Sequence, residues 1–323
     1  MIIRLINSMR CTIASRILSA RHPWRYGLAR RISPDTTSLI RHRPRKPPAL
    51  QLPLRSHLIY HQSSVDSQAA LNSIQTLASQ IPQDDEVLFL DIGATGDPEW
   101  LSPFSSHEWF SWSACRALHI EQQSYTFGLN AAMGSLKAKS LFVWRTDYVY
   151  PPDMVSRYQR ALETALFAAP YGVLIGQPHV DSGFVRSHTD RLSPFDESFW
   201  RACASPLSLY ETQDPALFAI DRELWRNIGG LNHSLWGYGW QFAEFAARVR
   251  TAAPASKINY FSGLPPVHQT HRGSNMHQPA DRAREAEMGR RRFCDFLGGE
   301  HAYEAYRLKQ VLPPQKKGEN GPT

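Results

Sequence analysis

The chain has 323 residues, of which 42% are hydrophobic and 20% are charged, and it holds nine tryptophans, twelve tyrosines and fifteen phenylalanines. So many aromatic side chains exclude a chain that is disordered throughout. The four cysteines are far apart and form no C-x-x-C pair, which argues against a disulfide framework, a zinc finger and a redox motif. No apolar run reaches the roughly eighteen residues of a membrane-spanning helix.

The net charge of +7 is unevenly distributed. Residues 1–55 contain twelve basic residues and one acidic residue, so the remainder has 24 basic and 28 acidic residues. We expect residues 1–54 to be a disordered basic leader: an organellar transit peptide, a tether that contacts a membrane surface, or an extension upstream of the true start. The location therefore stays open between the cytoplasm, a membrane surface and an organelle. A mildly acidic body argues against a nucleic-acid partner.

From residue 56 onward, apolar runs alternate with segments of helical periodicity. The expected elements, in chain order, are a strand at 57–60, a helix at 67–81, a strand at 86–93, a helix at 123–138, a strand at 140–150, a helix opening at the prolines 151–152, and a strand at 171–178. Strands that alternate with helices predict an α/β fold with a mostly parallel central sheet and helices on both faces.

Two aspartates end predicted strands, Asp91 after VLFL and Asp147 after the strand LFVW. Ligands of such sheets bind beyond the carboxyl ends of the strands, where a carboxylate holds a ribose, a base or a metal on a diphosphate. The alternative is that each aspartate caps the next turn. The sequence has no Walker loop, no G-x-G-x-x-G and no G-x-S-x-G. The motifs that would identify a P-loop protein, a dinucleotide-binding protein or an α/β hydrolase are therefore absent.

Four segments together resemble nucleotide-sugar glycosyltransferases of the GT-A fold, with a family-two-like N-terminal half and a galactosyltransferase-like C-terminal segment. They are FLDIGATGD (89–97), YTFGLNAAMGSLKAKSLFVWRTDYVYPPD (125–153), ALFAIDRELWRNIGGLNHSLWGYGWQFAEFAARV (216–249) and VHQTHRGSNMH (267–277). The resemblance implies a glycosyltransferase domain at 55–295, followed by a tail at 296–323 whose last residues are disordered.

The resemblance also implies a donor site. Its nucleotide-binding residues would be Asp91, Asn130, Arg145 and Asp147. A divalent metal, Mn²⁺ or Mg²⁺, would bind Asp147 and a downstream histidine. His271 is favoured because it lies 30 residues after Gln241, and His268 is the close second. Carboxylate ligands suit both metals, and an imidazole favours Mn²⁺. The alternative is that these histidines belong to a polar surface loop.

On the acceptor side, the implied residues are Gly230, Trp236, Tyr238, Trp240 and Gln241. The aromatic residues among them could stack on a sugar or pack in the core.

Two departures from the family pattern bear on activity. The first carboxylate of the Asp-x-Asp motif is Arg145, which could contact phosphate as a fixed cation or lower the affinity for metal. The Glu-Asp pair reads Gln241-Phe242, and phenylalanine cannot accept a proton. The nearest carboxylate, Glu244, could act as the general base or pair with Arg248 one helical turn away.

The sequence therefore predicts an enzyme that transfers a sugar from a nucleoside-diphosphate donor, with a UDP-sugar favoured, to a hydroxyl group of a glycan, lipid or protein. Metal dependence and inversion of the anomeric centre are the default expectations. The alternative is a non-catalytic protein of the same fold that binds nucleotide or glycan, or serves as a partner subunit.

Overall fold

The computed structural model describes residues 52–62, 65–92, 99–104, 106–107, 109–115, 121–174, 180–189, 197–203, 209–211, 216–232 and 240–270. The predicted tail at 296–323 and nearly all of the predicted leader lie outside these ranges, so the domain limits stay predictions. Within them, no helix has both the length and the apolarity that crossing a membrane requires.

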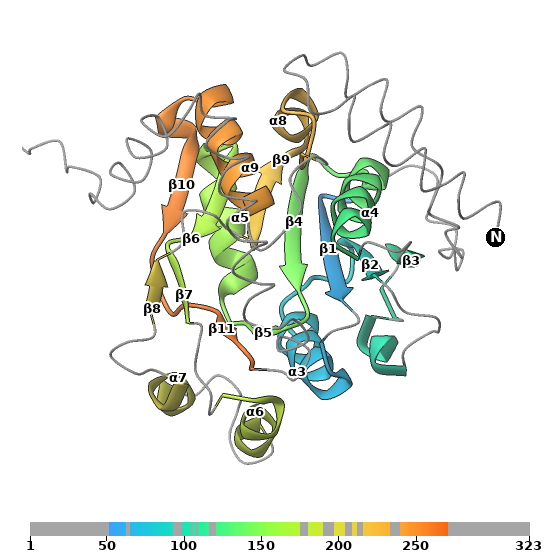
Figure 1. Cartoon of the computed structure of the whole chain (residues 1–323), viewed down its shortest axis with the longest axis vertical. Helices are drawn as coiled ribbons and strands as arrows, with labels where there is room; N and C mark the ends of the chain where they lie inside the picture. The colour runs from blue at the N-terminus through green and yellow to red at the C-terminus, as the bar shows by residue number, and fades with distance from the viewer. Residues whose placement is uncertain are drawn as a thin grey trace, which may run out of the picture.

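A seven-stranded sheet forms the centre of the described structure, in the order β10-β6-β9-β4-β1-β2-β3 (Figure 1). Its strands are β1 (Arg55–Gln62), β2 (Glu86–Ile92), β3 (Trp109–Cys115), β4 (Ser140–Arg145), β6 (Phe167–Pro170), β9 (Phe218–Asp221) and β10 (Ile258–Phe261). Neighbouring strands are parallel except at β9, which runs antiparallel to both β4 and β6. The predicted mostly parallel α/β sheet is confirmed.

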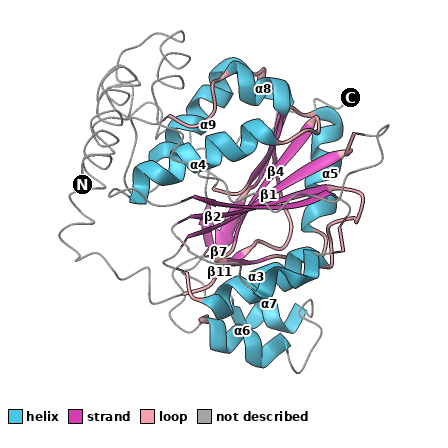
Figure 2. Cartoon of the chain, turned by 90° about the vertical axis from the view of Figure 1, so that its right-hand side faces the viewer, coloured by secondary structure: helices cyan, strands magenta, loops and turns pink. Residues whose placement is uncertain are grey.

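Helices cover both faces of this sheet, as expected (Figure 2). One face packs against α4 (Glu121–Ser135), α8 (Arg222–Asn227) and α9 (Trp240–Ala252). The other face packs against α3 (Ser67–Ala78), the 3₁₀ helix η1 (Glu99–Phe104) and α5 (Met154–Thr164). Alternate residues of one strand enter opposite cores, so Tyr60 lies in the first and Ile59 in the second. The middles of the central strands are runs of apolar residues, as expected for strands that are buried on both faces.

A smaller four-stranded sheet lies at the end of the main sheet where β1 and β4 finish (Figure 1). Its order is β5-β11-β7-β8, with β5 (Tyr148–Val149), β11 (Val267–His268), β7 (Gly172–Leu174) and β8 (Leu209–Glu211). Two helices, α6 (Ser182–Thr189) and α7 (Glu197–Cys203), share a third apolar cluster with this sheet. The remaining described helix is the 3₁₀ turn η2 (Ala255–Lys257).

The predicted strand at 140–150 is two strands, because β4 ends at Arg145 and the chain turns at Thr146 and Asp147 before β5. The turn is fixed by the Tyr150 hydroxyl, which accepts from the Arg145 N–H at 2.8 Å and donates to the Arg145 carbonyl at 2.7 Å. The predicted strand at 171–178 is represented by β7, and residues 175–179 lie outside the described ranges. This turn places Asp147 beyond the main sheet, beside β11.

Candidate functional site

Polar side chains gather where the central strands end. Asp91 is the penultimate residue of β2, and in the strand register it lies beside His61 of β1. On the other side of β1, Tyr60 is in register with Arg145, the last residue of β4. The His61 ring nitrogen Nδ1 lies 2.9 Å from the Thr146 hydroxyl. The carboxyl ends of three adjacent parallel strands therefore meet at one edge, the place where open α/β sheets bind ligands.

The most highly charged part of this edge is a cluster of Arg145, Asp147 and His268. The Arg145 Nε donates to Asp147 Oδ1 at 2.8 Å, and its Nη2 donates to Oδ2. The His268 Nε2 lies 3.1 Å from the same Oδ2. The Asp147 side chain is 2% exposed, whereas Arg145 is 23% exposed and His268 is 21% exposed. A buried carboxylate thus holds a guanidinium and an imidazole that both reach the surface.

These neighbours keep Asp147 ionised. Burial by itself would raise the pKa of the Asp147 carboxyl, but the charges of Arg145 and His268 and their hydrogen bonds outweigh burial and hold the pKa far below its ordinary value. The guanidinium of Arg145 also lies 5.4 Å from the ring centre of Tyr148, within the range of a cation–π contact.

A buried polar network between α3, the turn at Asp147 and Gln269 positions this cluster. The Gln269 backbone N–H donates to the Asp147 carbonyl at 2.8 Å, and the Ser73 hydroxyl donates to the Thr146 carbonyl at 2.7 Å. The Gln269 side chain donates to the Ala69 carbonyl at 2.9 Å and accepts from Asn72 at 2.9 Å. Gln269 is fully buried. Helix α3 therefore holds the turn that carries Asp147 and the strand that carries His268.

Asp91 is buried without such support. Its Oδ1 has no hydrogen-bond partner among the described residues, and the residue is 1% exposed. Burial raises the pKa of Asp91 to about 7. A buried carboxylate oxygen without a partner in a native structure calls for an explanation, and a ligand donor at this edge is one. A role in binding nucleotide stays a prediction.

Asn130 of α4 holds the chain that follows α8. Its Nδ2 donates to the Leu231 carbonyl at 2.8 Å, and its Oδ1 accepts from the Leu231 N–H at 2.8 Å. The preceding Gly230 has a φ of 71°, and a Cβ added there would lie 2.5 Å from Asn130 Oδ1. Asn130 and Gly230 thus fix the backbone at the point where the predicted acceptor segment begins. Their predicted ligand contacts stay predictions.

The predicted base, Glu244 of α9, is fully buried. Its two oxygens accept from Arg248 Nε at 2.6 Å and Nη2 at 2.7 Å, and Asn232 Nδ2 lies 3.4 Å from Oε1. This geometry favours the alternative that Glu244 pairs with Arg248. In the same helix, the Gln241 Oε1 is buried without a hydrogen-bond partner among the described residues.

Three predicted site residues, Trp236, Tyr238 and His271, lie outside the described residues. Trp240 is placed only as the first residue of α9. Of the two histidines favoured as metal ligands, only His268 lies within the described residues, and it lies beside Asp147.

A divalent metal at this cluster can be tested against the geometry. The separation of 3.1 Å between Asp147 Oδ2 and His268 Nε2 would suit two ligands at right angles with bonds of about 2.1 Å. However, Arg145 donates to both oxygens of the carboxylate, so the pair is already neutral and its guanidinium repels a second cation. Among the described residues, no group of three or more His, Cys, Asp or Glu side chains could hold a metal. The described arrangement does not fit the metal.

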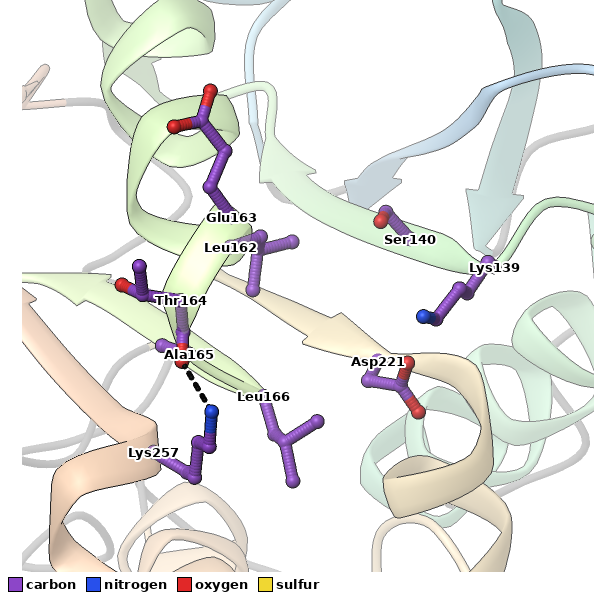
Figure 3. A pocket seen from close by; sticks show the side chains of 9 residues that line it. All are labelled: Lys139, Ser140, Leu162, Glu163, Thr164, Ala165, Leu166, Asp221 and Lys257. Atoms are coloured by element: carbon purple, nitrogen blue, oxygen red, sulfur yellow. Dashed lines mark hydrogen bonds between the residues drawn. The ribbon is translucent and has the colours of Figure 1, made fainter.

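A hollow of about 250 Å³ lies at the opposite, amino edge of the sheet (Figure 3). Lys139 and Ser140 line it at the start of β4, and Asp221 lines it at the end of β9. Lys257 also lines it and donates to the Thr164 carbonyl at 3.0 Å. Because it lies beyond the amino ends of the strands, this hollow is separate from the cluster around Asp147.

Sequence reasoning missed four residues of the candidate site, namely His61, Asn72, Ser73 and Gln269. His61 could have been found by the same rule that selected Asp91, since it too stands at the end of a predicted strand. Gln269 directly follows a selected histidine, but nothing in its sequence neighbourhood shows that it is buried against α3.

By sequence, the chain matches no protein-family model and no curated protein. By structure, it is similar to S. aureus TarS residues 1–349, with a TM-score of 0.50, 11% identity, and coverage of 80% of this chain and 70% of that chain. The same fragment in complex with UDP-GlcNAc matches with a TM-score of 0.51, 12% identity, and coverage of 79% and 72%. In a longer TarS structure the match spans 42% of that chain and 79% of this one, with a TM-score of 0.48 and 11% identity.

The strand order, the helices on both faces and the two matches with TM-scores of 0.50 and 0.51 define the fold as the GT-A fold. The family-level resemblance in the sequence is thereby confirmed at the level of the fold.

Proposed function

We propose that this protein is a glycosyltransferase that moves a sugar from a nucleoside-diphosphate donor, with a UDP-sugar favoured, to a hydroxyl group of a glycan, lipid or protein. The observation that carries this proposal is the charged cluster of Arg145, Asp147 and His268 at the carboxyl edge of a GT-A sheet. The complex of S. aureus TarS with UDP-GlcNAc supports the choice of donor class, because that protein shares the fold.

The chemistry needs positive charge at the leaving group. The acceptor oxygen bonds to the anomeric carbon, the bond from that carbon to the diphosphate oxygen breaks, and its electron pair stays on the diphosphate. The acceptor proton passes to a base or to water. Because the departing diphosphate gains a negative charge, groups such as Arg145 and His268 that stabilise an anion lower the barrier. The sequence also predicts a divalent cation, but the described residues do not fit one, so the charge at the leaving group is assigned to these side chains.

The nucleotide would extend from this cluster towards Asp91, whose buried oxygen could accept from the base or the ribose. The acceptor would lie beside the segment that begins at Gly230 and ends at α9. Inversion would require a general base, and Glu244 could serve only after leaving Arg248. The favoured alternative within this fold is therefore a protein that binds donor without efficient transfer.

Two measurements test the proposal. UDP-sugars and GDP-sugars should raise the midpoint of thermal unfolding, since a ligand selective for the native state stabilises it by mass action. The purified protein should also release nucleoside diphosphate slowly from its donor, because water replaces the acceptor. Binding without release would favour the non-catalytic alternative, and no thermal shift with any of these donors would contradict the proposal.

A further inference from the structure

We infer that Arg145, rather than a divalent cation, supplies the positive charge that binds the donor diphosphate, so that donor binding is independent of metal. This inference rests on the proposed function and deepens it. The fold family implies a divalent metal at this place. The side chains there do not suit one, because an arginine already neutralises the carboxylate.

The guanidinium is held in one orientation. A planar guanidinium has two hydrogen-bonding edges, and Asp147 accepts from the edge formed by Nε and Nη2. The edge formed by Nη1 and Nη2 therefore points away from this carboxylate. The Arg145 backbone is bonded in both directions to the Tyr150 hydroxyl, and Tyr150 is fully buried. A fixed fork of donors at a strand end matches the oxygens of a diphosphate.

Asp147 then acts as a positioning residue. Its carboxylate is buried and accepts from both Arg145 and His268, so it aligns a guanidinium and an imidazole that are each about one-fifth exposed. His268 Nε2, which faces the Asp147 carboxylate, is used as a donor there, whereas a metal ligand needs the lone pair of that nitrogen. The same three side chains that disfavour a cation are thus arranged to receive an anion.

The first experiment measures the affinity for UDP and for GDP by calorimetry, in EDTA and in Mn²⁺. The wild-type protein should bind one of these nucleotides with the same affinity in both buffers. Arg145→Ala should weaken binding at least tenfold in both. A matched control is Arg55→Ala, because Arg55 is similarly exposed, at 24%, and donates to a buried aspartate, Asp85, at the opposite edge. This control should keep the wild-type affinity.

The second experiment restores the family motif with Arg145→Asp. This variant should lose nucleotide binding in EDTA and recover it in Mn²⁺, which would convert a metal-independent site into a metal-dependent one. Its thermal unfolding curve establishes that the variant is folded. If it does not fold, Arg145→Ala decides the question, because its weakened binding does not depend on the new carboxylate.

The outcomes separate the inference from the proposed function. Wild-type nucleotide binding that requires Mn²⁺, together with sugar release, would overturn the inference and leave the proposed function standing. Metal-independent binding without release from any donor would support the inference and contradict the transferase activity. A lack of binding in both buffers would overturn both. An Arg145→Asp variant that binds nucleotide in EDTA like the wild type would also overturn the inference.

Discussion

The two edges of the central sheet carry clusters of the same three residue types. At the amino edge, Asp85 accepts from Arg55 Nε at 2.7 and 2.9 Å, and its Oδ2 lies 3.0 Å from His57 Nε2. At the carboxyl edge, Asp147 has a similar relation to Arg145 and His268. In both clusters an arginine bonded to both carboxylate oxygens and an imidazole share one buried aspartate.

The two clusters differ in the exposure of their histidines. His57 is fully buried, and its Nδ1 accepts from the Trp144 indole N–H at 3.1 Å, so both ring nitrogens are used within the core. His268 is 21% exposed and belongs to a short strand at the ligand edge. Residue types alone therefore do not define a functional site, because the edge of the sheet and the exposure of the partners decide what a cluster can bind.

The largest expected effect is the loss of stability when the amino-edge cluster is broken. Asp85→Ala should lower the free energy of unfolding by about 3–5 kcal/mol, because it leaves the guanidinium of Arg55 without its counter-charge and the buried imidazole of His57 without its hydrogen-bond partner. Asp147→Ala should cost less stability, because Arg145 and His268 can turn towards water, but it should weaken nucleotide binding. Urea unfolding and calorimetry on both variants measure the contrast. Equal losses of stability with unchanged binding would remove the distinction between the edges.

The second expected effect depends on pH. Burial raises the pKa of Asp91 to about 7, so the folded protein retains a proton that the unfolded chain releases near pH 4. The stabilisation from this proton is complete below about pH 4 and is lost as the pH rises through 7. Asp91→Asn should therefore raise the midpoint of thermal unfolding by several degrees at pH 8 and leave it nearly unchanged at pH 4. A variant with the same gain at both pH values would contradict this.

A smaller effect tests the network beneath the carboxyl edge. Gln269→Leu should cost about 1–3 kcal/mol, because Asn72 and the Ala69 carbonyl lose a buried partner. It should also slow the release of nucleoside diphosphate from the donor, since it loosens the strand that carries His268. The matched control is Gln75→Leu, an exposed glutamine on α3. A control as destabilised as Gln269→Leu would show that the network is not the cause.

The smallest effect concerns an ion pair outside both clusters. Arg226 donates to Glu223 at 2.9 Å, and the two side chains are 53% and 65% exposed. Arg226→Ala should change the free energy of unfolding by less than about 0.5 kcal/mol, because exposed pairs are screened by water. Urea unfolding at low and high salt checks this. A loss comparable to that of Asp85→Ala would show that burial does not explain the difference between clusters.

Periodicity predicted three of the seven strands of the main sheet, β1, β2 and β4, because strands buried on both faces are rich in consecutive apolar residues. Strands β1 and β2 and helices α3, α4 and α5 lie within a few residues of their predicted bounds. Strands β3, β6 and β10 were not predicted, and neither was the antiparallel strand β9. It has four residues, FAID, and its pairing with β4 and β6 is a long-range property that local pattern does not reveal.

The site was predictable where strand ends define it and not where distant segments meet there. Asp91 and Asp147 followed from their strands. The proximity of His268 to Asp147 depends on β11 pairing with β5, which sets His268 opposite Tyr148. Counting residues from Gln241 favoured His271, which lies outside the described residues, so that choice stays a prediction. Sequence reasoning also missed the pairing of Arg145 with Asp147, although the residues are two positions apart, because it depends on the turn that ends β4.

The contact between Gly230 and Asn130 has a consequence for how this sequence can change over time. Any side chain at position 230 meets the Asn130 amide and also adopts a backbone conformation that L-residues disfavour. A shorter residue at position 130 would remove the collision with Asn130 but would leave the Leu231 peptide without both of its hydrogen bonds to that side chain. Descendants of this chain should therefore keep these two positions together or replace them together, which makes the pair a marker for aligning distant relatives.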